Sequence, residues 1–332
     1  MREIIERRSE LLVTNQEIMC KSFMLEHTLT NAVVAAAFAE KDREADPELI
    51  KEARKVLKKK QGVFSDFRSY NELIVSARMA LSADPEGYLD EVIEVYDKLR
   101  KGRLFGSSYR VLAAMSICDQ GRYSEADSLI GRTNEIMKGM NKAHPFLTSD
   151  EDTCFAVLLA MTDKSVEDIL IELENSFRIV KKIFAFHDNA SYSLAQVLTA
   201  YDGDYEKKCA KALELFDAFK AAGTKYGKEH ELASLGALID IDAGIDEIVS
   251  EVIGVAEHLK GKKGFGMLDM GRETRLMFGT MLVSGAHYAG EYKANASSIG
   301  GEIGQVVAVQ TAILITMMLI MTTTVAASSA SH

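Results

Sequence analysis

The feature that most constrains the fold of this chain is an amphipathic pattern that returns about every forty residues. In each copy, apolar side chains fall near positions i, i+3, i+4 and i+7, which is the spacing of one face of an α-helix. The copies begin at Leu89, Ala126, Leu170, Cys209 and Val249, so the successive steps are 37, 44, 39 and 40 residues. A single unit of this length cannot bury its apolar face, and neighbouring units must therefore pack against one another.

A second marker keeps nearly the same period. A short turn containing an aspartate precedes each copy, and a shorter apolar segment precedes each turn. The apolar segments span residues 73–83, 111–117, 155–161, 194–201 and 232–241, and the turn aspartates are Asp84, Asp119, Asp163, Asp202 and Asp242. An aspartate at the start of a helix accepts hydrogen bonds from free N–H groups and interacts favourably with the helix dipole. We therefore expect these five aspartates to cap the amphipathic helices.

Together the two markers predict an all-α protein of stacked helical hairpins and no β-strand. The hairpins would form either an α-solenoid or a closed array. A period near forty residues is closer to that of HEAT repeats than to the 34-residue tetratricopeptide unit.

The same patterns predict how the chain is divided. We expect N-terminal helices in residues 1–69, hairpin repeats in 70–284, a linker rich in Gly, Ser and Ala in 285–304, and an apolar terminal helix in 305–327. Residues 1–42 and 47–61 are expected as long helices, the second capped by Asp46 with Pro47 at its first position. The last repeat helix is expected over 276–283, ending at Ser284 and Gly285.

The C-terminal segment allows two interpretations. Residues 303–332 contain no Asp, Glu, Lys or Arg, and the apolar part is long enough to cross a bilayer. A helix that is apolar on all sides is either buried in a large core or surrounded by lipid. The pattern therefore predicts a buried terminal helix or, alternatively, a membrane tail over residues 303–327.

Charge and cysteine content indicate which classes of partner and which cellular compartment to expect. With 39 Lys and Arg against 49 Asp and Glu, the formal net charge is −10, which argues against a nucleic-acid partner. The four cysteines are far apart and form no C-x-x-C pair, as in a protein of the reducing cytoplasm. We expect a cytoplasmic protein without a bound metal or other cofactor.

Three short motifs carry a family resemblance. Phe64-Ser65-Asp66-Phe67-Arg68 is followed by an Asp-Pro-Glu turn that starts at Asp84, and then by the pair Tyr96 and Leu99. This order resembles a bacterial family catalogued as domain of unknown function number 4003, whose members also end in an apolar segment. The resemblance covers most of the chain. It implies an all-helical bacterial protein with no assigned activity, and it supplies no catalytic residues.

The residues of the first motif have a structural interpretation. We expect Phe64 and Phe67 to pack at the start of the first hairpin. Arg68 is expected to pair with a carboxylate or a carbonyl, with a role in ligand binding as the alternative.

Three histidines are weaker candidates for a binding site. His144, His187 and His230 are separated by 43 and 43 residues, and each lies between successive hairpins. On stacked hairpins they would follow one edge, where a partner, an anion or a metal could bind. Their distance to the next turn aspartate changes from repeat to repeat, and packed helices lie about 8–10 Å apart, which is too far for one ion to join them. Recurring loop residues are therefore the favoured interpretation.

No catalytic motif is complete. The segment that begins at His230-Glu231 resembles a zinc-protease helix, but Ser234 occupies the position of the second ligand. The sequence therefore favours a non-enzymatic helical-repeat protein that binds another protein or acts as a scaffold. The alternatives are a membrane-tethered adaptor held by residues 303–327, and an enzyme whose site is assembled from polar residues of several hairpins.

Overall fold

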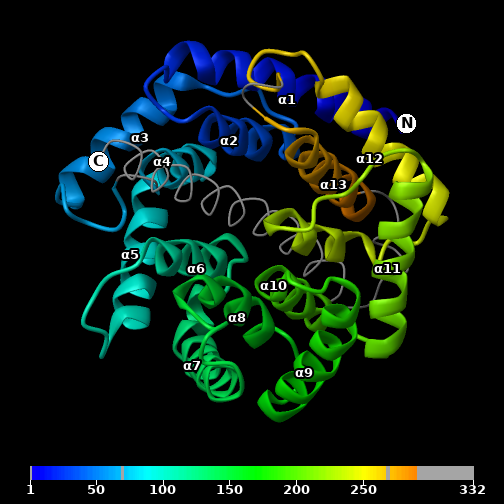
Figure 1. The fold of residues 1–332 in the computed structure, drawn as a ribbon. Coiled ribbons are helices and arrows are strands. Elements are labelled where there is room, and N and C mark those ends of the chain that lie inside the picture. Colours follow the sequence, from blue (N-terminus) through cyan, green and yellow to red (C-terminus); the bar gives the residue numbers. More distant parts are fainter. Residues whose placement is uncertain (1, 69–70, 267–269, 290–332) are drawn as a thin grey trace, which may run out of the picture. The chain divides into compact units, whose positions relative to one another are not determined.

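The computed structural model describes residues 2–68, 71–266 and 270–289, and every regular element in these ranges is a helix. Figure 1 shows these helices along the chain, which divides into two compact units. One unit comprises residues 46–172 and is called the middle unit below. The other comprises the residues up to 45 together with those from 173 onward, and is called the terminal unit.

The middle unit contains three pairs of helices, each an amphipathic helix followed by an apolar one. Within each pair the two helices pack closely, and successive pairs contact each other through α4 and α5 and through α6 and α8. The elements are α3 (Pro47–Lys60), α4 (Glu72–Leu81), α5 (Pro85–Arg100), α6 (Ser108–Asp119), the short 3-10 helix η2 (Tyr123–Glu125), α7 (Ala126–Ala143), η3 (Asp150–Asp152), α8 (Thr153–Ala160) and the start of α9 (Val166–Ile183).

The terminal unit is built from the two ends of the chain. Helices α1 and α2 pack against α12 and α13, so the first pair of helices contacts the last one described. The elements are α1 (Glu3–Ser22), α2 (Thr28–Glu40), the rest of α9, α10 (Asp188–Ala200), α11 (Tyr205–Ala221), the 3-10 helix η4 (His230–Leu238), α12 (Ile245–Leu259) and α13 (Arg272–Ala289).

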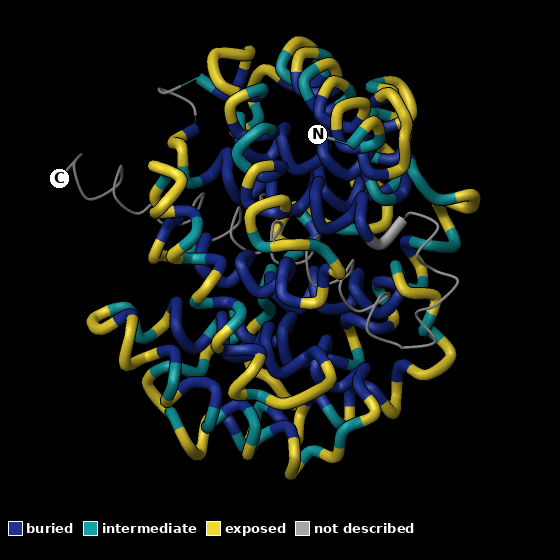
Figure 2. The backbone as a smooth tube through the Cα atoms, turned by 90° about the vertical axis from the view of Figure 1, so that its right-hand side faces the viewer, coloured by how far each residue is buried: buried dark blue, intermediate teal, exposed yellow. Residues whose placement is uncertain are grey.

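Burial distinguishes the two helices of each pair. The amphipathic helix α5 buries one stripe, consisting of Leu89, Val92, Val95, Tyr96 and Leu99, and exposes its charged side. The apolar helix α6 buries every residue from Tyr109 to Cys118, because it is covered on all sides. The same alternation recurs along the backbone, where long buried segments follow half-exposed ones (Figure 2).

All five stripes predicted from the forty-residue pattern are helical, and they form α5, α7, α9, α11 and α12. The most extensive contacts join α5 to α6, α7 to α8 and α12 to α13, in each case a stripe helix to the apolar helix that follows it, whereas η4 packs mainly against α10 and α13. Contact across the aspartate turn, as between α4 and α5, is less extensive. The sequence pattern indicated that a stripe helix pairs with the apolar helix before it. In these cases it pairs instead with the apolar helix after it.

Three helix boundaries differ from the prediction. Residues 1–42 are not one helix, because Phe23–His27 separates α1 from α2. The apolar segment 232–241 lies mostly in η4 and is a 3-10 helix instead of an α-helix. Helix α13 continues past Ser284 and Gly285 to Ala289, because the Ser284 hydroxyl donates to the carbonyl of Ala237 and Gly285 allows close packing against Glu40. The start of α3 was predicted correctly, since Asp46 accepts hydrogen bonds from the N–H groups of Glu48 and Leu49.

Only one of the five turn aspartates caps a helix in the expected way. Asp84 accepts a hydrogen bond from the N–H of Gly87 at the start of α5. Asp119 instead ends α6 and accepts from the hydroxyl of Tyr88, at 2.8 Å. At the turns of Asp163 and Asp202 the next helix is capped by another residue, and at the turn of Asp242 it has no side-chain cap. Ser165 accepts from the N–H of Asp168 in α9, and Asp204 accepts from the N–H of Lys207 in α11. Gly244 precedes α12 and provides no side-chain cap.

The apolar terminal helix expected over 305–327, and the linker beyond residue 289, lie outside the described residues. Among the helices that are described, none has the length and apolar character needed to cross a membrane. The domain boundaries expected at residues 69 and 284 stay predictions.

Candidate functional site

The loop between α3 and α4 separates the two phenylalanines of the first motif. Phe67 is buried and packs edge-to-face on Tyr96, with ring centroids 5.1 Å apart, and the Tyr96 hydroxyl donates to the carboxylate of Asp66. Phe64 is fully exposed, at 102%. The expectation that both rings pack at the start of the first hairpin is therefore wrong for Phe64. In this irregular loop the two side chains do not share the face that a helical spacing would give them.

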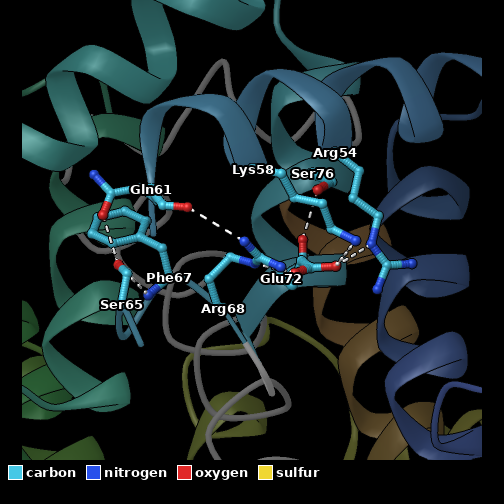
Figure 3. Close-up of polar contacts among 8 residues, drawn as sticks. All are labelled: Arg54, Lys58, Gln61, Ser65, Phe67, Arg68, Glu72 and Ser76. Carbon is cyan, nitrogen blue, oxygen red and sulfur yellow. Dashed lines mark hydrogen bonds and ion pairs between the residues drawn. The ribbon is translucent and has the colours of Figure 1, made fainter. Parts of the chain in front are cut away.

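Arg68 belongs to a charged cluster around the buried carboxylate of Glu72 (Figure 3). Its Nε donates to Glu72 and its Nη1 donates to the carbonyl of Gln61, at 3.3 Å. Arg54 Nε also donates to Glu72, and Lys58 Nζ lies 3.2 Å from the same carboxylate. The contacts made by Arg68 are those that a structural role predicts, because they tie the α3–α4 loop to both of its helices.

The cluster fixes the charge state of Glu72. Burial on its own would raise the pKa of this carboxyl, but the hydrogen bonds from Arg54, Arg68 and Lys58 outweigh burial and hold the pKa below its ordinary value. Glu72 is consequently ionised at neutral pH and serves as the anion that joins three cations. A carboxylate occupied in this way is a structural anchor.

The three candidate histidines are not brought together. His144 follows α7 in the middle unit, whereas His187 and His230 belong to the terminal unit. His187 Nδ1 lies 2.9 Å from the carboxylate of Glu229, so that its loop meets the residue just before His230. Within the ranges that the structure describes, no group of three or more His, Cys, Asp or Glu side chains is placed to hold a metal ion.

One buried polar cluster was missed by the sequence analysis. In the terminal unit, His287 Nε2 lies 3.0 Å from the Glu251 carboxylate, and Arg2 contacts both side chains. The histidine and the glutamate are both nearly closed to solvent, at 6% and 7% exposure. These residues come from α12, α13 and the start of the chain, and no local motif links them. They join the first helix to the last pair described.

The most unusual surface of the middle unit consists of exposed apolar side chains on three successive loops, and we call it the loop edge. It lies on the loops α3–α4, α5–α6 and α7–α8. Its members and their exposed fractions are Val63 (73%), Phe64 (102%), Leu104 (90%), Phe105 (81%) and Phe146 (99%). Single exposed apolar residues are common on protein surfaces, but a series at one position of each repeat indicates a surface that contacts something else.

The loop edge has a sequence signal that the stripe pattern hides. Phe64, Phe105 and Phe146 are separated by 41 and 41 residues. In the terminal unit, Leu25 and Phe186 occupy the corresponding loops and are also fully exposed, at 103% and 100%. The steps from Leu25 to Phe64 and from Phe146 to Phe186 are 39 and 40 residues. An apolar residue that recurs in the loops with the period of the repeat is therefore a signal that the sequence alone contains.

Direct contacts place the three loops of the middle unit next to one another. The Asn71 side chain donates both to the carbonyl of Asp66 in its own loop and to the carbonyl of Ser108 after the next loop. Gly106 lies so close to Asp66 that a side chain there would clash with the carboxylate. Arg110, which is 5% exposed, donates to the carbonyl of Phe105 at 2.8 Å and pairs with Asp150 beyond the third loop at 2.5 Å.

Two polar cavities lie between these loops. The first, of about 260 Å³, is bordered by Phe64, Asp66, Tyr96, Arg100 and Gly106 among others. The second, of about 610 Å³, lies between the α5–α6 loop and the end of α7. It is lined by Lys101, Arg103, Asn134, Met137, Lys138, Asn141, Thr148, Ser149 and Asp150. The second cavity is rich in hydrogen-bond donors and in positive charge.

The loop edge is basic although the chain as a whole is acidic. The cations on the last two turns of α3, α5 and α7 and on the loop after α5 include Lys58, Lys59, Lys60, Lys98, Arg100, Lys101, Arg103, Lys138 and Lys142. Lys60 and Lys98 are paired with Asp90 and Asp127 of the following amphipathic helices. Exposed apolar side chains framed by cations are thus the property that distinguishes this surface.

Comparison with known proteins confirms the family resemblance. A family model described as "Protein of unknown function (DUF4003)" matches residues 16–318, which is most of the chain. Neither the search of curated proteins nor the search of solved structures gave a match. The Phe-Ser-x-Phe-Arg motif at residues 64–68, the helical architecture and this match agree, and the chain belongs to the DUF4003 family.

Proposed function

We propose that this chain is a non-enzymatic helical-repeat protein that works by docking its loop edge onto a partner surface. One observation carries the proposal. Large apolar side chains are exposed at the same position of three successive loops, 41 residues apart each time. A side chain that contributed only to folding would be buried, as Phe67 is in the same loop.

The proposal includes the stacked-hairpin architecture that the sequence pattern predicts. Helix pairs that repeat about every forty residues support it, because stacking would place the corresponding loops of successive repeats side by side. In the middle unit the Asn71 and Arg110 contacts join neighbouring loops in this manner. A bacterial and cytoplasmic origin belongs to the same proposal, and the apolar segment 303–327 takes no part in it.

The binding interpretation also agrees with how the loops are held. Arg110 fixes the backbone of Phe105 from a buried position, while the phenylalanine side chain remains 81% exposed. A fixed backbone that presents a free apolar side chain needs little reorganisation on binding, and a pre-organised surface binds at lower entropic cost.

Site-directed photo-crosslinking tests the proposal. A photoreactive phenylalanine analogue at position 105 of the full chain should form adducts in cells that produce the protein. The matched control carries the same analogue at Ser124, which is also exposed but lies on η2, away from the loop edge. Adducts at position 105 that exceed those at position 124 support the proposal, whether the captured molecule is a protein or a lipid. Equal or absent capture at the two positions would contradict it.

A further inference from the structure

We infer that the partner of the loop edge is an anionic phospholipid bilayer, which the middle unit binds peripherally through its α5–α6 and α7–α8 loops. The inference rests on the proposed function and names its partner. In this arrangement Leu104, Phe105 and Phe146 enter the interfacial region of the bilayer, and the basic cavity between the two loops receives a phosphate headgroup.

The apolar part of this surface has the form expected for entry into lipid. Leu104, Phe105 and Phe146 are exposed at 90%, 81% and 99%, so each side chain projects from the protein and none forms the wall of an apolar groove. The two cavities beside them are lined mainly by polar and charged residues. A protein partner would have to supply separate pockets for isolated projections, whereas lipid surrounds each of them without a matching shape.

The charged part favours an anionic surface. Lys101, Arg103, Lys138 and Lys142 form no ion pair with an acidic side chain within the part of the chain that the structure describes. The acidic groups nearby are the exposed Asp97 and Glu135, Asp66 beneath the hydroxyl of Tyr96, and the three acids of η3. Of those three, Asp150 lines the larger cavity and is paired with Arg110, Glu151 accepts from the hydroxyl of Tyr109, and Asp152 accepts from the N–H of Ser149. Cations that remain unpaired in a chain of net charge −10 would draw this surface, and not the rest of the molecule, towards anionic lipid.

The 610 Å³ cavity provides a place for one headgroup. Lys101, Arg103 and Lys138 bring positive charge to it, and Asn134, Asn141 and Ser149 add polar groups. Thr148 also lines it.

Helix dipoles account for only part of this charge. Lys98 and Arg100 lie in the last turn of α5, where a cation is favourable on dipole grounds alone. Arg103 and Phe105 lie beyond the end of the helix, after Gly102 has turned the chain with a φ of +79°. The same succession of helix-end lysines and an exposed apolar residue occurs at Lys181, Lys182 and Phe186 in the terminal unit.

Vesicle flotation of the full chain tests the inference. The probes are vesicles of phosphatidylcholine alone and vesicles of equal parts phosphatidylcholine and phosphatidylglycerol. The chain should float with the mixed vesicles and only weakly with phosphatidylcholine, and added salt should weaken its binding. Equal binding to both kinds of vesicle, or binding to neither, would overturn the inference.

Substitutions identify the residues responsible. The double variant F105S/F146S should bind the mixed vesicles about a hundredfold more weakly, at roughly tenfold for each phenyl group withdrawn from the apolar phase. The variant K101Q/R103Q/K138Q should lose the preference for phosphatidylglycerol. Ile171→Ser is the matched control, because Ile171 is 54% exposed on α9 and lies off the loop edge, and it should bind like the unaltered chain.

Two outcomes separate this inference from the proposed function. All variants retain residues 303–327, so undiminished flotation of F105S/F146S would show that another segment holds the membrane and would overturn the inference. Crosslinks from position 105 to a protein, together with no vesicle binding, would also overturn it while leaving the proposed function standing. Circular dichroism of each variant checks that the fold is intact.

Discussion

Replacing Glu72 by glutamine should lower the free energy of unfolding of the middle unit by about 2–4 kcal/mol. The amide keeps the size of the side chain but removes the charge that Arg54, Arg68 and Lys58 share. A hydrogen bond to a charged group contributes about 1.5–3 kcal/mol against about 1 kcal/mol for a neutral one. Two guanidinium groups, 24% and 15% exposed, carry most of this loss, and the half-exposed Lys58 adds little because solvent screens it.

Hydrogen exchange of the α4 amides in increasing urea measures this change within the middle unit. The effect should depend on pH with a definite sign. The folded pKa of Glu72 is lowered, so its contribution is complete above the ordinary carboxyl range and is lost as the pH falls through the folded value. The unaltered chain and E72Q should therefore become alike in acid.

A matched control is available on the exposed face of α3. Glu48 pairs with Lys51 at 2.7 Å, but the carboxylate side chain is 78% exposed, and Glu48→Gln should change stability by less than about 0.5 kcal/mol. Equal effects of the two substitutions, or a difference between E72Q and the unaltered chain that stays constant from neutral pH into acid, would refute the electrostatic account of this cluster.

Three further predictions test the packing, the capping and the buried charge. Phe67→Ala should destabilise the middle unit by about 3–5 kcal/mol because it opens a cavity against Tyr96, whereas Phe64→Ala should change stability by less than about 0.5 kcal/mol; urea unfolding compares them. Asp84→Ala should cost about 1 kcal/mol through loss of the α5 cap, and Asp242→Ala should cost little; equal losses in thermal unfolding would contradict the assignment. Burial raises the pKa of Glu231, so its ionised form is disfavoured at neutral pH. This penalty begins to shrink as the pH falls through the raised folded pKa and is gone below the ordinary carboxyl range. Glu231→Gln should therefore raise the melting temperature at neutral pH and have no such effect in acid.

The helices could be predicted because their signal is local and repeated. One apolar stripe, as in α5, faces a neighbouring helix, and its 3.6-residue periodicity is visible without knowledge of that neighbour. The packed pairs could not be predicted, because an apolar helix such as α6 is buried on all sides and its sequence does not show which neighbour it contacts most.

The functional surface was harder to predict for a related reason. Phe64 and Phe67 are alike in type and three residues apart, yet one is exposed and the other buried, since the intervening chain is a loop with no fixed periodicity. Likewise, Asp119 does not cap the next helix but accepts a hydrogen bond from the hydroxyl of Tyr88. These two residues are 31 positions apart, so no local pattern predicts the contact. The forty-residue recurrence of exposed apolar residues was present in the sequence, but their exposure became evident only in the structure.

The central claim is that the loop edge enters an apolar, anionic surface, and the fluorescence of a single tryptophan tests it most directly. The chain contains no tryptophan, so Phe105→Trp and Ser124→Trp each introduce a unique reporter at an exposed position. On addition of mixed phosphatidylcholine and phosphatidylglycerol vesicles, the emission of the position-105 reporter should move to shorter wavelength while that of the position-124 reporter stays constant. An unchanged spectrum at position 105, or equal shifts at both positions, would contradict the account.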